Sequence, residues 1–227
     1  MIFKDLRTKN WCWTIPSYKK MINNLVGDEY SNEKNITDVI WDVKKHEANR
    51  VNEVLEINYD DIVFDVGSGA GMIAFYVAKQ CKQLYCIDVS KNFLKYAKQN
   101  NKNNQNIKYV KISHGNIPDI SRPTKIYCLA MFIHYCYYDI HHYLKIFYEK
   151  LNDNGTVFFD IIPDDQTFPD SADYKKNMDR YLKNPNRIFY DVKHHNPLII
   201  ERIIESIGFK INNSFNDAGH KFYILKK

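Results

Sequence analysis

The chain has 227 residues, 44% of them apolar, which suits a single α/β domain with additions and a large buried core. No stretch approaches the roughly 20 continuous apolar residues of a membrane span, and no apolar signal core stands at the start. The five cysteines include no C-x-x-C pair, which is typical of reduced thiols in the cytoplasm. The net charge of +5 slightly favours an anionic small-molecule substrate, and neither a nucleic acid nor a membrane is expected as a partner.

Residues 1–58 precede the α/β pattern and are predicted to form a cap or lid extension. The segment holds an aromatic group that includes Trp11, Trp13 and Tyr18. Behind it, apolar residues from Ile36 to Leu55 recur at helical spacing and fall on one stripe of an amphipathic helix. This helix either closes over a ligand or covers the sheet, and the sequence leaves both roles open.

A glycine-rich turn follows the first predicted strand. Ile62–Val66 is short, apolar and rich in β-branched residues, which is typical of a strand buried on both faces. Glycines at 67, 69 and 71 come next, and Met72–Cys81 is predicted to be a helix. A strand, a glycine turn and a helix together bring backbone N–H groups up to a polar ligand. A dinucleotide fingerprint would need glycine at position 72, so a nicotinamide dehydrogenase is disfavoured.

The second predicted strand, Leu84–Asp88, ends in an acid 17 residues beyond Gly71. A carboxylate at the tip of this strand can accept hydrogen bonds from both ribose hydroxyls of a nucleoside. Asp88 could instead start the following helix, because Ser90 and the apolar spacing behind it predict a helix start there. The glycine turn nearby makes ribose binding the preferred interpretation.

The rest of the chain continues the alternation of strands and helices that indicates a parallel sheet. Residues 163–195 contain three prolines and little periodicity, and they are predicted to be a substrate-side insertion. Asn196, followed by Pro197, predicts the N-terminus of a helix. Asn154-Gly155 predicts a glycine cap at the end of the helix at 138–151. Strands are predicted at 107–112, 125–131, 156–162, from 208 onward and at 221–225, with helices at 138–151 and 197–207.

The G-x-G-x-G turn with Asp65 ahead of it, the acid at 88 and the closing Gly208-Phe209 hairpin resemble the class I S-adenosylmethionine-dependent methyltransferases. The resemblance covers about residues 60–227. It implies an α/β fold with a doubly wound, seven-stranded, mostly parallel sheet that ends in an antiparallel hairpin strand. This methyltransferase domain would span residues 59–227. S-adenosyl-L-methionine is the implied methyl donor, and S-adenosyl-L-homocysteine is the implied product.

The resemblance assigns the donor site to residues that follow strands. Asp65 and the glycine turn would hold the methionine part, and Asp88 the ribose. Asn116 stands where the family has an acid that accepts from the adenine amino group, and its amide oxygen still accepts, in a weaker hydrogen bond. The implied donor-binding residues are Asp65, Gly67, Ser68, Gly69, Gly71, Asp88, Val89, Asn116, Ile117 and Met131.

Histidines and tyrosines are the candidates for the acceptor side. His134 follows the fourth predicted strand, where a base with a reference pKa of about 6.5 could reach a hydroxyl; alternatively it opens the next helix. Tyr18, Tyr135, His194 and His195 are predicted substrate contacts. No metal site is predicted, although Asp160, Asp164 and Asp165 occur together. Metal-dependent relatives also use an acid at the tip of the fourth strand, and this chain has none there.

These observations predict a cytoplasmic methyltransferase that acts on a small polar acceptor, with oxygen slightly favoured over nitrogen. A sugar, a sugar phosphate or a nucleotide-linked saccharide fits the mild basic charge and the aromatic and histidine residues of the additions. The absence of Asn-Pro-Pro-Tyr or Asp-Pro-Pro-Tyr counts against methylation of base amino groups. RNA methylation stays open as an alternative. So does a non-catalytic binding module, because Asn116 and Lys125 depart from the family pattern.

Overall fold

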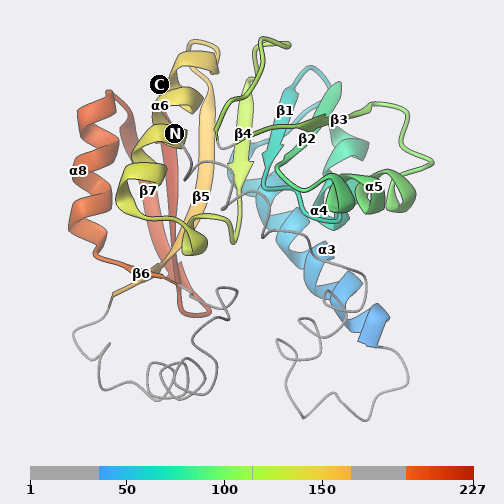
Figure 1. The fold of residues 1–227 in the computed structure, drawn as a ribbon, viewed down its shortest axis with the longest axis horizontal. Helices are drawn as coiled ribbons and strands as arrows, with labels where there is room; N and C mark the ends of the chain where they lie inside the picture. Colours follow the sequence, from blue (N-terminus) through green and yellow to red (C-terminus); the bar gives the residue numbers. More distant parts are fainter. Residues whose placement is uncertain (1–35, 114, 165–192) are drawn as a thin grey trace. The chain divides into compact units, whose positions relative to one another are not determined.

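The computed structural model describes residues 36–113, 115–164 and 193–227. Contacts between Cα atoms divide the chain after Tyr127 into two compact units, 1–127 and 128–227. Figure 1 colours the first unit from blue to green and the second from yellow-green to red. The predicted extension 1–58 and insertion 163–195 stay predictions, because residues 1–35 and 165–192 lie outside the described ranges.

Parallel strands form the sheet of the first unit. β1 lies between β2 and β4, and β3 pairs with the other side of β2. Parallel strands share one carboxyl edge, so the residues that follow β1, β2 and β3 lie along the same edge of this sheet (Figure 1). The elements are α3 (Ile36–Leu55), β1 (Ile62–Val66), α4 (Met72–Val77), the 3₁₀ helix η2 (Ala78–Gln80), β2 (Gln83–Asp88), α5 (Lys91–Asn100), β3 (Ile107–Lys111) and β4 (Lys125–Cys128).

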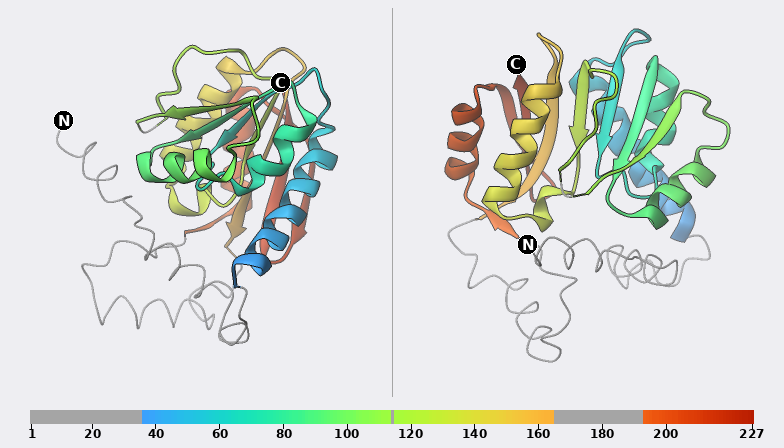
Figure 2. Two further views of the ribbon diagram at one scale, coloured as in Figure 1. Left: turned by 90° about the vertical axis from the view of Figure 1, so that its right-hand side faces the viewer. Right: turned by 45° about the horizontal axis from the view of Figure 1, so that its top comes forward.

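The core of the first unit forms around β1. Val63 and Phe64 are fully buried, as expected for a β-branched and aromatic strand inside a parallel sheet. α3 packs against α4, where the Trp41 ring lies edge-on at 5.3 Å from Phe75, and Figure 2 shows the two helices side by side. Val51 and Leu55 of the predicted stripe are buried together with Ala48, whereas Val43 is 48% exposed, so the end of the stripe nearest β1 forms part of this packed layer.

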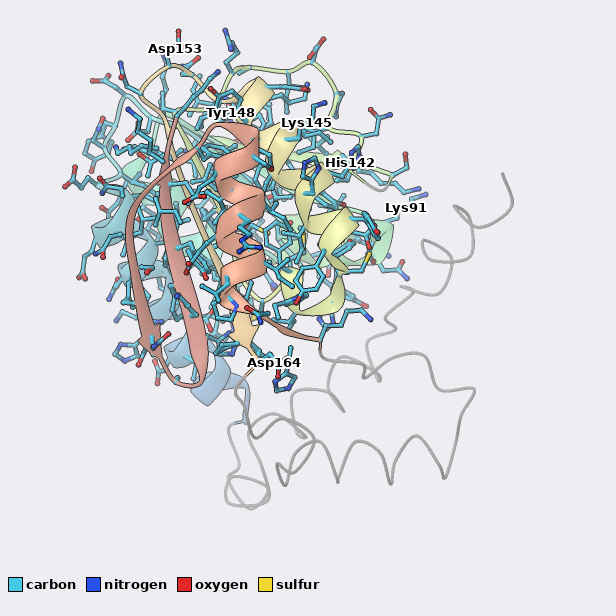
Figure 3. The ribbon with its side chains drawn as sticks, turned by 90° about the vertical axis from the view of Figure 1, so that its left-hand side faces the viewer. Lys91, His142, Lys145, Tyr148, Asp153 and Asp164 are labelled. Carbon is cyan, nitrogen blue, oxygen red and sulfur yellow. The ribbon has the colours of Figure 1, made fainter. Side chains whose placement is uncertain are left out.

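Antiparallel pairing dominates the second unit. β8 pairs antiparallel with both β5 and β7, and the short β6 pairs parallel with the end of β5. α6 and α8 lie side by side (Figure 3). The elements are the 3₁₀ helix η3 (Phe132–His134), α6 (Tyr137–Lys150), β5 (Thr156–Pro163), β6 (His194–His195), α8 (Pro197–Ile207), β7 (Lys210–Asp217) and β8 (His220–Lys226).

Aromatic side chains fill the core of the second unit. Phe132, Phe147 and Phe159 are fully buried, and the Phe132 ring lies 5.2 Å from Phe159 in an edge-to-face contact. Asn196 caps α8 by accepting from Leu198 N at 2.9 Å, as predicted. α8 ends at Gly208, whose φ of 105° lies in the left-handed region.

The fold prediction is confirmed: strands and helices alternate, the early strands pair in parallel and an antiparallel hairpin ends the chain. Two details differ. α6 ends at Leu151 in extended backbone, and Asn154, not Gly155, takes the left-handed conformation. Glycine is still required at 155, because a Cβ there would lie 2.5 Å from Leu151 Cγ. β4 stops at Cys128, three residues short of the prediction. Among the described residues, no helix is long and apolar enough to cross a membrane.

Candidate functional site

The glycine turn after β1 uses its glycines in two ways. Gly67, Gly69 and Gly71 all have φ between 52° and 78°, which a side chain would strain. A Cβ on Gly71 would lie 2.8 Å from Ala97 Cβ, so this glycine lets α5 approach the turn. A Cβ on Gly69 would meet nothing within 4 Å. The turn is therefore packed at Gly71 and open at Gly69, where a ligand has room.

Asp65 is a buried acid next to this turn. Its side chain is 4% exposed, and Oδ2 has no hydrogen-bond partner among the described residues. The Tyr127 hydroxyl is also buried without a hydrogen-bond partner among the described residues. Burial raises the pKa of Asp65 to about 8; Tyr127 lowers it, the Asp88 charge raises it further and the Lys44 charge lowers it. An ammonium group beside Asp65 would supply the missing partner and favour the ionised acid.

Asp88 ties the glycine turn to the start of α5. Its Oδ2 accepts from Gly69 N at 2.9 Å, and its Oδ1 accepts from Ser90 N at 2.7 Å. Burial raises the pKa of Asp88, and these backbone N–H groups oppose that rise. Ser90 caps α5 by accepting from Phe93 N at 3.2 Å. Each carboxylate oxygen keeps a second lone pair, so Asp88 can anchor the helix start and still accept from ligand hydroxyls.

The other donor-site residues of the first unit follow the same strand ends. Val89 directly follows Asp88 and is half-buried. Asn116 and Ile117 come after β3, where Gly115 has a φ of 74°. Ile117 is buried, whereas Asn116 is exposed with its backbone N–H donating to Ser113 O at 2.8 Å. Ser68, within the turn, is half-buried, and its hydroxyl has no hydrogen-bond partner among the described residues.

In the second unit, a short turn after β4 carries Met131 and His134. Met131 is buried and precedes η3, and His134 N donates to Met131 O at 3.1 Å. Burial lowers the pKa of His134 to about 4; the Lys193 charge lowers it too, and the Asp160 charge raises it. The imidazole is therefore neutral at pH 7, but it is a weaker base than the reference value of about 6.5 implied.

His195 on β6 has one ring nitrogen engaged and one open. Nε2 lies 3.1 Å from Phe132 O, and a carbonyl oxygen can only accept, so Nε2 carries the hydrogen. Burial lowers the pKa of His195, which keeps the ring neutral and leaves a lone pair on Nδ1. Nδ1 is buried without a hydrogen-bond partner in the part of the chain that the structure describes. This nitrogen can accept a hydrogen bond from a ligand.

For the remaining predicted substrate contacts, the structure gives the burial of His194 and Tyr135 and one ring contact. His194 is half-buried beside His195, and Tyr135 is half-buried with its ring 5.4 Å from Tyr143. Tyr18 lies outside the described residues. Figure 3 shows Asp153 and Asp164 at opposite ends of β5, which places Asp164 at the carboxyl end.

Asp160 and His220 form a partly buried contact that the sequence did not predict. Asp160 lies inside β5 and is 2% exposed. Its Oδ1 accepts from Ala130 N at 2.7 Å, and its Oδ2 lies 2.5 Å from His220 Nδ1. No group of three or more metal-ligating side chains occurs within residues 36–113, 115–164 and 193–227. The signal for Asp160 was available, because an aspartate in the middle of TVFFDIIP is a charge within an apolar strand.

The residues of the first unit fit a nucleoside that carries an amino acid. Asp65 offers a buried carboxylate oxygen that needs a cation, Gly69 leaves open space beside it, and Asp88 keeps lone pairs for hydroxyl groups. These are the hydrogen-bond acceptors that S-adenosylmethionine requires for its ammonium group and its ribose hydroxyls.

Comparisons with known proteins agree with this geometry. A sequence model described as a methyltransferase domain matches residues 64–159. An uncharacterized protein of Methanocaldococcus jannaschii is 42% identical over 48 residues, which is 21% of this chain and 18% of that protein. A probable cobalt-precorrin-6B C(15)-methyltransferase (decarboxylating) of the same organism is 39% identical over 66 residues, 29% of this chain and 36% of that protein. The matches thus span only about a fifth and about a third of these relatives.

Solved structures show the same fold. The magnesium protoporphyrin IX methyltransferase of Synechocystis PCC 6803 with bound S-adenosylmethionine aligns with a TM-score of 0.66 at 14% identity. The alignment covers 100% of this chain and 96% of that chain. At this identity the likeness shows the fold alone. The matched domain model begins within β1 and includes the glycine turn and β2 with Asp88. Residues 64–159 thus match a methyltransferase domain, within a fold that is shared with a solved methyltransferase.

Proposed function

We propose that this protein is an enzyme that transfers a methyl group from S-adenosylmethionine to a small polar acceptor, with oxygen slightly favoured over nitrogen. The observation that carries the proposal is the unpartnered oxygen of buried Asp65 beside the open Gly69. Burial raises the pKa of Asp65 to about 8, so the free protein holds this acid mostly protonated at pH 7, and a cation that arrives with the ligand would give its ionised form a partner. The match of residues 64–159 to a methyltransferase domain supports the same donor.

Donor binding in this proposal rests on groups of the first unit. Asp65 holds the ammonium group, Asp88 accepts from the ribose hydroxyls, and Val89, Asn116 and Ile117 contact the adenine. Gly67, Ser68, Gly69 and Gly71 form the backbone wall around the methionine part, to which the family resemblance also assigns Met131. The bound sulfonium supplies an already activated methyl group. The protein then contributes mainly alignment, which can be worth several kcal/mol.

Proton transfer from the acceptor is the role proposed for His134. The ring is neutral at pH 7, as a proton acceptor must be. Its pKa of about 4 makes it a weak base, so we expect proton transfer to accompany methyl transfer and not to precede it. His134→Ala should lower kcat and leave the affinity for S-adenosylhomocysteine within about twofold. An unchanged kcat would remove His134 from the reaction.

Acceptor recognition is assigned to Tyr18, Tyr135, His194 and His195. The lone pair on His195 Nδ1 favours an acceptor with a hydroxyl or amino group that can donate to it. The net charge of +5, with Lys193 next to His194, favours an anionic acceptor such as a sugar phosphate or a nucleotide-linked saccharide. A neutral sugar remains within the proposal, and so does a cytoplasmic location.

Titration calorimetry with the full chain tests the donor assignment. We expect S-adenosylmethionine and S-adenosylhomocysteine to bind with dissociation constants on the order of micromolar, about −8 kcal/mol. The absence of binding by either compound at millimolar concentration would overturn the proposed cofactor. A panel of sugars, sugar phosphates and nucleotide sugars, scored by release of S-adenosylhomocysteine, then tests the acceptor class.

Two alternatives have distinct outcomes in the same experiments. RNA methylation would show as RNA binding that falls steeply with salt, because phosphate contacts release counterions. A non-catalytic module would bind the donor and methylate nothing, and the exposed Asn116 in place of the family's acid is the observation that favours it.

A further inference from the structure

The turn after β4 contains a strained residue. Ala130 has a φ of 52°, in the left-handed region where a residue with a Cβ is disfavoured. Such conformations persist only where the surroundings hold them, and they often occur at functional sites. The sequence places no glycine here, so some other group of the protein must hold the turn.

Asp160 supplies that hold. Its Oδ1 accepts from the Ala130 backbone N–H at 2.7 Å, 30 residues away in the chain. A short charge-assisted hydrogen bond of this kind is stronger than a bond between neutral groups. Because Asp160 is 2% exposed inside β5, little water competes for its oxygen.

His220 completes the arrangement from the start of β8. Its Nδ1 lies 2.5 Å from Asp160 Oδ2, so both oxygens of the buried acid are engaged. The His220 ring also stacks on Phe222 with 6.1 Å between the ring centres. One carboxylate thus joins the interior of β5, the start of β8 and the turn after β4.

The turn that Asp160 holds carries two candidate site residues. Met131 follows Ala130 directly, and His134 N donates to Met131 O at 3.1 Å. A change of φ at Ala130 would rotate the chain at Met131 and move η3 with it. The geometry at Ala130 therefore sets where Met131 and His134 stand.

We infer that Asp160, supported by His220, is a positioning residue that holds the turn at Ala130 in its left-handed form and so places Met131 and His134. The inference rests on the proposed function, in which these two residues contact the donor and the acceptor. Asp160 itself needs no contact with either ligand. It acts through the backbone of Ala130.

Three variants test the inference through binding of S-adenosylhomocysteine. Asp160→Leu removes the acceptor for Ala130 N at similar volume, and we expect the dissociation constant to rise about tenfold. Asp160→Asn keeps an amide oxygen for the same N–H, and we expect a rise of at most about threefold. Adding Ala130→Gly to Asp160→Leu should recover at least about threefold, because glycine adopts this φ without strain.

A matched control separates this rescue from a general effect of glycine. Glu56 is another residue with a left-handed φ, 50°, and Asp160 does not contact its backbone. Glu56→Gly in the Asp160→Leu background should leave the weakened binding unchanged. Equal rescue by both glycine variants would overturn the inference, and so would wild-type affinity in folded Asp160→Leu protein.

Urea unfolding of the same variants tests, without any ligand, whether Asp160 stabilises the left-handed turn at Ala130. Asp160→Leu should lower the urea concentration at which half of the protein is unfolded. If Asp160 holds Ala130, adding Ala130→Gly should restore part of that loss. The same addition to Asp160→Asn should change the midpoint much less. Independent effects of the two positions would overturn the inference. If the wild type fails to bind S-adenosylhomocysteine while this coupling is present, the proposed function fails and the hold on the turn stands. If Asp160→Leu does not fold, Asp160→Asn with and without Ala130→Gly supplies the comparison.

Discussion

Asp65 and Asp160 are both aspartates buried inside strands, yet their oxygens are used differently. Asp160 has one oxygen on Ala130 N and the other on His220 Nδ1. Asp65 Oδ2 has no hydrogen-bond partner among the described residues. A buried charge is retained only where a partner offsets its desolvation. The comparison separates an acid that holds the protein's own backbone from an acid that is left open to a ligand.

Asp88 combines the two uses in one carboxylate. Each of its oxygens accepts one backbone N–H, from Gly69 or Ser90, and each has a lone pair left. It therefore shapes the turn and can still bind hydroxyl groups. The three acids differ in their partners: Asp65 Oδ2 has none among the described residues, Asp88 accepts from two backbone N–H groups beside the open Gly69, and Asp160 joins Ala130 to His220.

Substitution of Asp160 and of Asp65, one at a time, should show the difference between the two acids most clearly. Asp160→Leu should lower the free energy of unfolding by about 3–4 kcal/mol, because it leaves His220 and the Ala130 N–H without their partner. Asp65→Asn should change it by less than about 1 kcal/mol at pH 7, because no hydrogen bond to Oδ2 is lost. Urea denaturation measures both, and equal losses would contradict the distinction.

The glycines beside Asp65 give the next largest effect. Gly71→Ala should cost roughly 2–3 kcal/mol of unfolding free energy, from the strained φ of 68° and the 2.8 Å approach to Ala97 Cβ. Gly69→Ala has the same backbone strain without the clash and should cost about 1 kcal/mol. Its methyl group would instead occupy space open to the donor, so Gly69→Ala should weaken S-adenosylhomocysteine binding. A larger stability loss at 69 than at 71 would refute this division.

Asp88→Ala should weaken donor binding by roughly 1.5–3 kcal/mol, the range for hydrogen bonds to a charged group. Part of the loss comes from the turn, because Gly69 N loses its acceptor. Asp88→Asn serves as the control, since an amide oxygen can keep one of the two backbone contacts. Unchanged affinity of a folded Asp88→Ala protein, measured by titration calorimetry, would remove Asp88 from the donor site.

Short sequence signals were sufficient to predict part of the fold and the acids of the donor site. The strand Ile62–Val66 and the helix Pro197–Ile207 were predicted with their observed bounds, because the glycine turn and the Asn196 cap mark their ends. The donor acids could be proposed because they lie close to the glycine turn in sequence. Short-range spacing was sufficient for both.

The acceptor side depends on contacts between residues far apart in the chain, which spacing does not reveal. β4 ends early because Ala130 turns under the hold of Asp160, 30 residues later. The partner of Asp160, His220, lies another 60 residues on. The tautomer of His195 is likewise set by Phe132 O, 63 residues away. These pairings follow from the sheet, and only the apolar run around Asp160 marked it in advance.

The open oxygen of Asp65 predicts a pH dependence. Burial raises the pKa of this acid to about 8 in the folded protein, against 3.8 as its ordinary value. The folded state therefore holds the proton more tightly, and this group's contribution to stability falls as pH rises from about 4 to about 8. A bound ammonium favours the ionised acid, so binding below pH 8 releases a proton.

Affinity for S-adenosylhomocysteine should therefore weaken by up to about tenfold per pH unit, about 1.4 kcal/mol, as pH falls from 8 to 6. Titrations of the wild type and of Asp65→Asn in matched buffers check this. The asparagine variant should bind more weakly and lose the slope. A slope retained by Asp65→Asn would assign the proton to another group.

The smallest expected effect concerns Asn116, which adds an acid where the protein has none. Asn116→Asp places a carboxylate after β3, and a carboxylate accepts from an amino group more strongly than an amide does. Because the side chain is exposed, solvent screens most of the gain, and we expect tighter S-adenosylhomocysteine binding by about 0.5 kcal/mol, roughly twofold. Homocysteine lacks the adenine, so its binding should not change. An equal gain for homocysteine would mean that the new charge attracts the ligand's ammonium group from a distance. The assignment of Asn116 to the adenine would then be wrong.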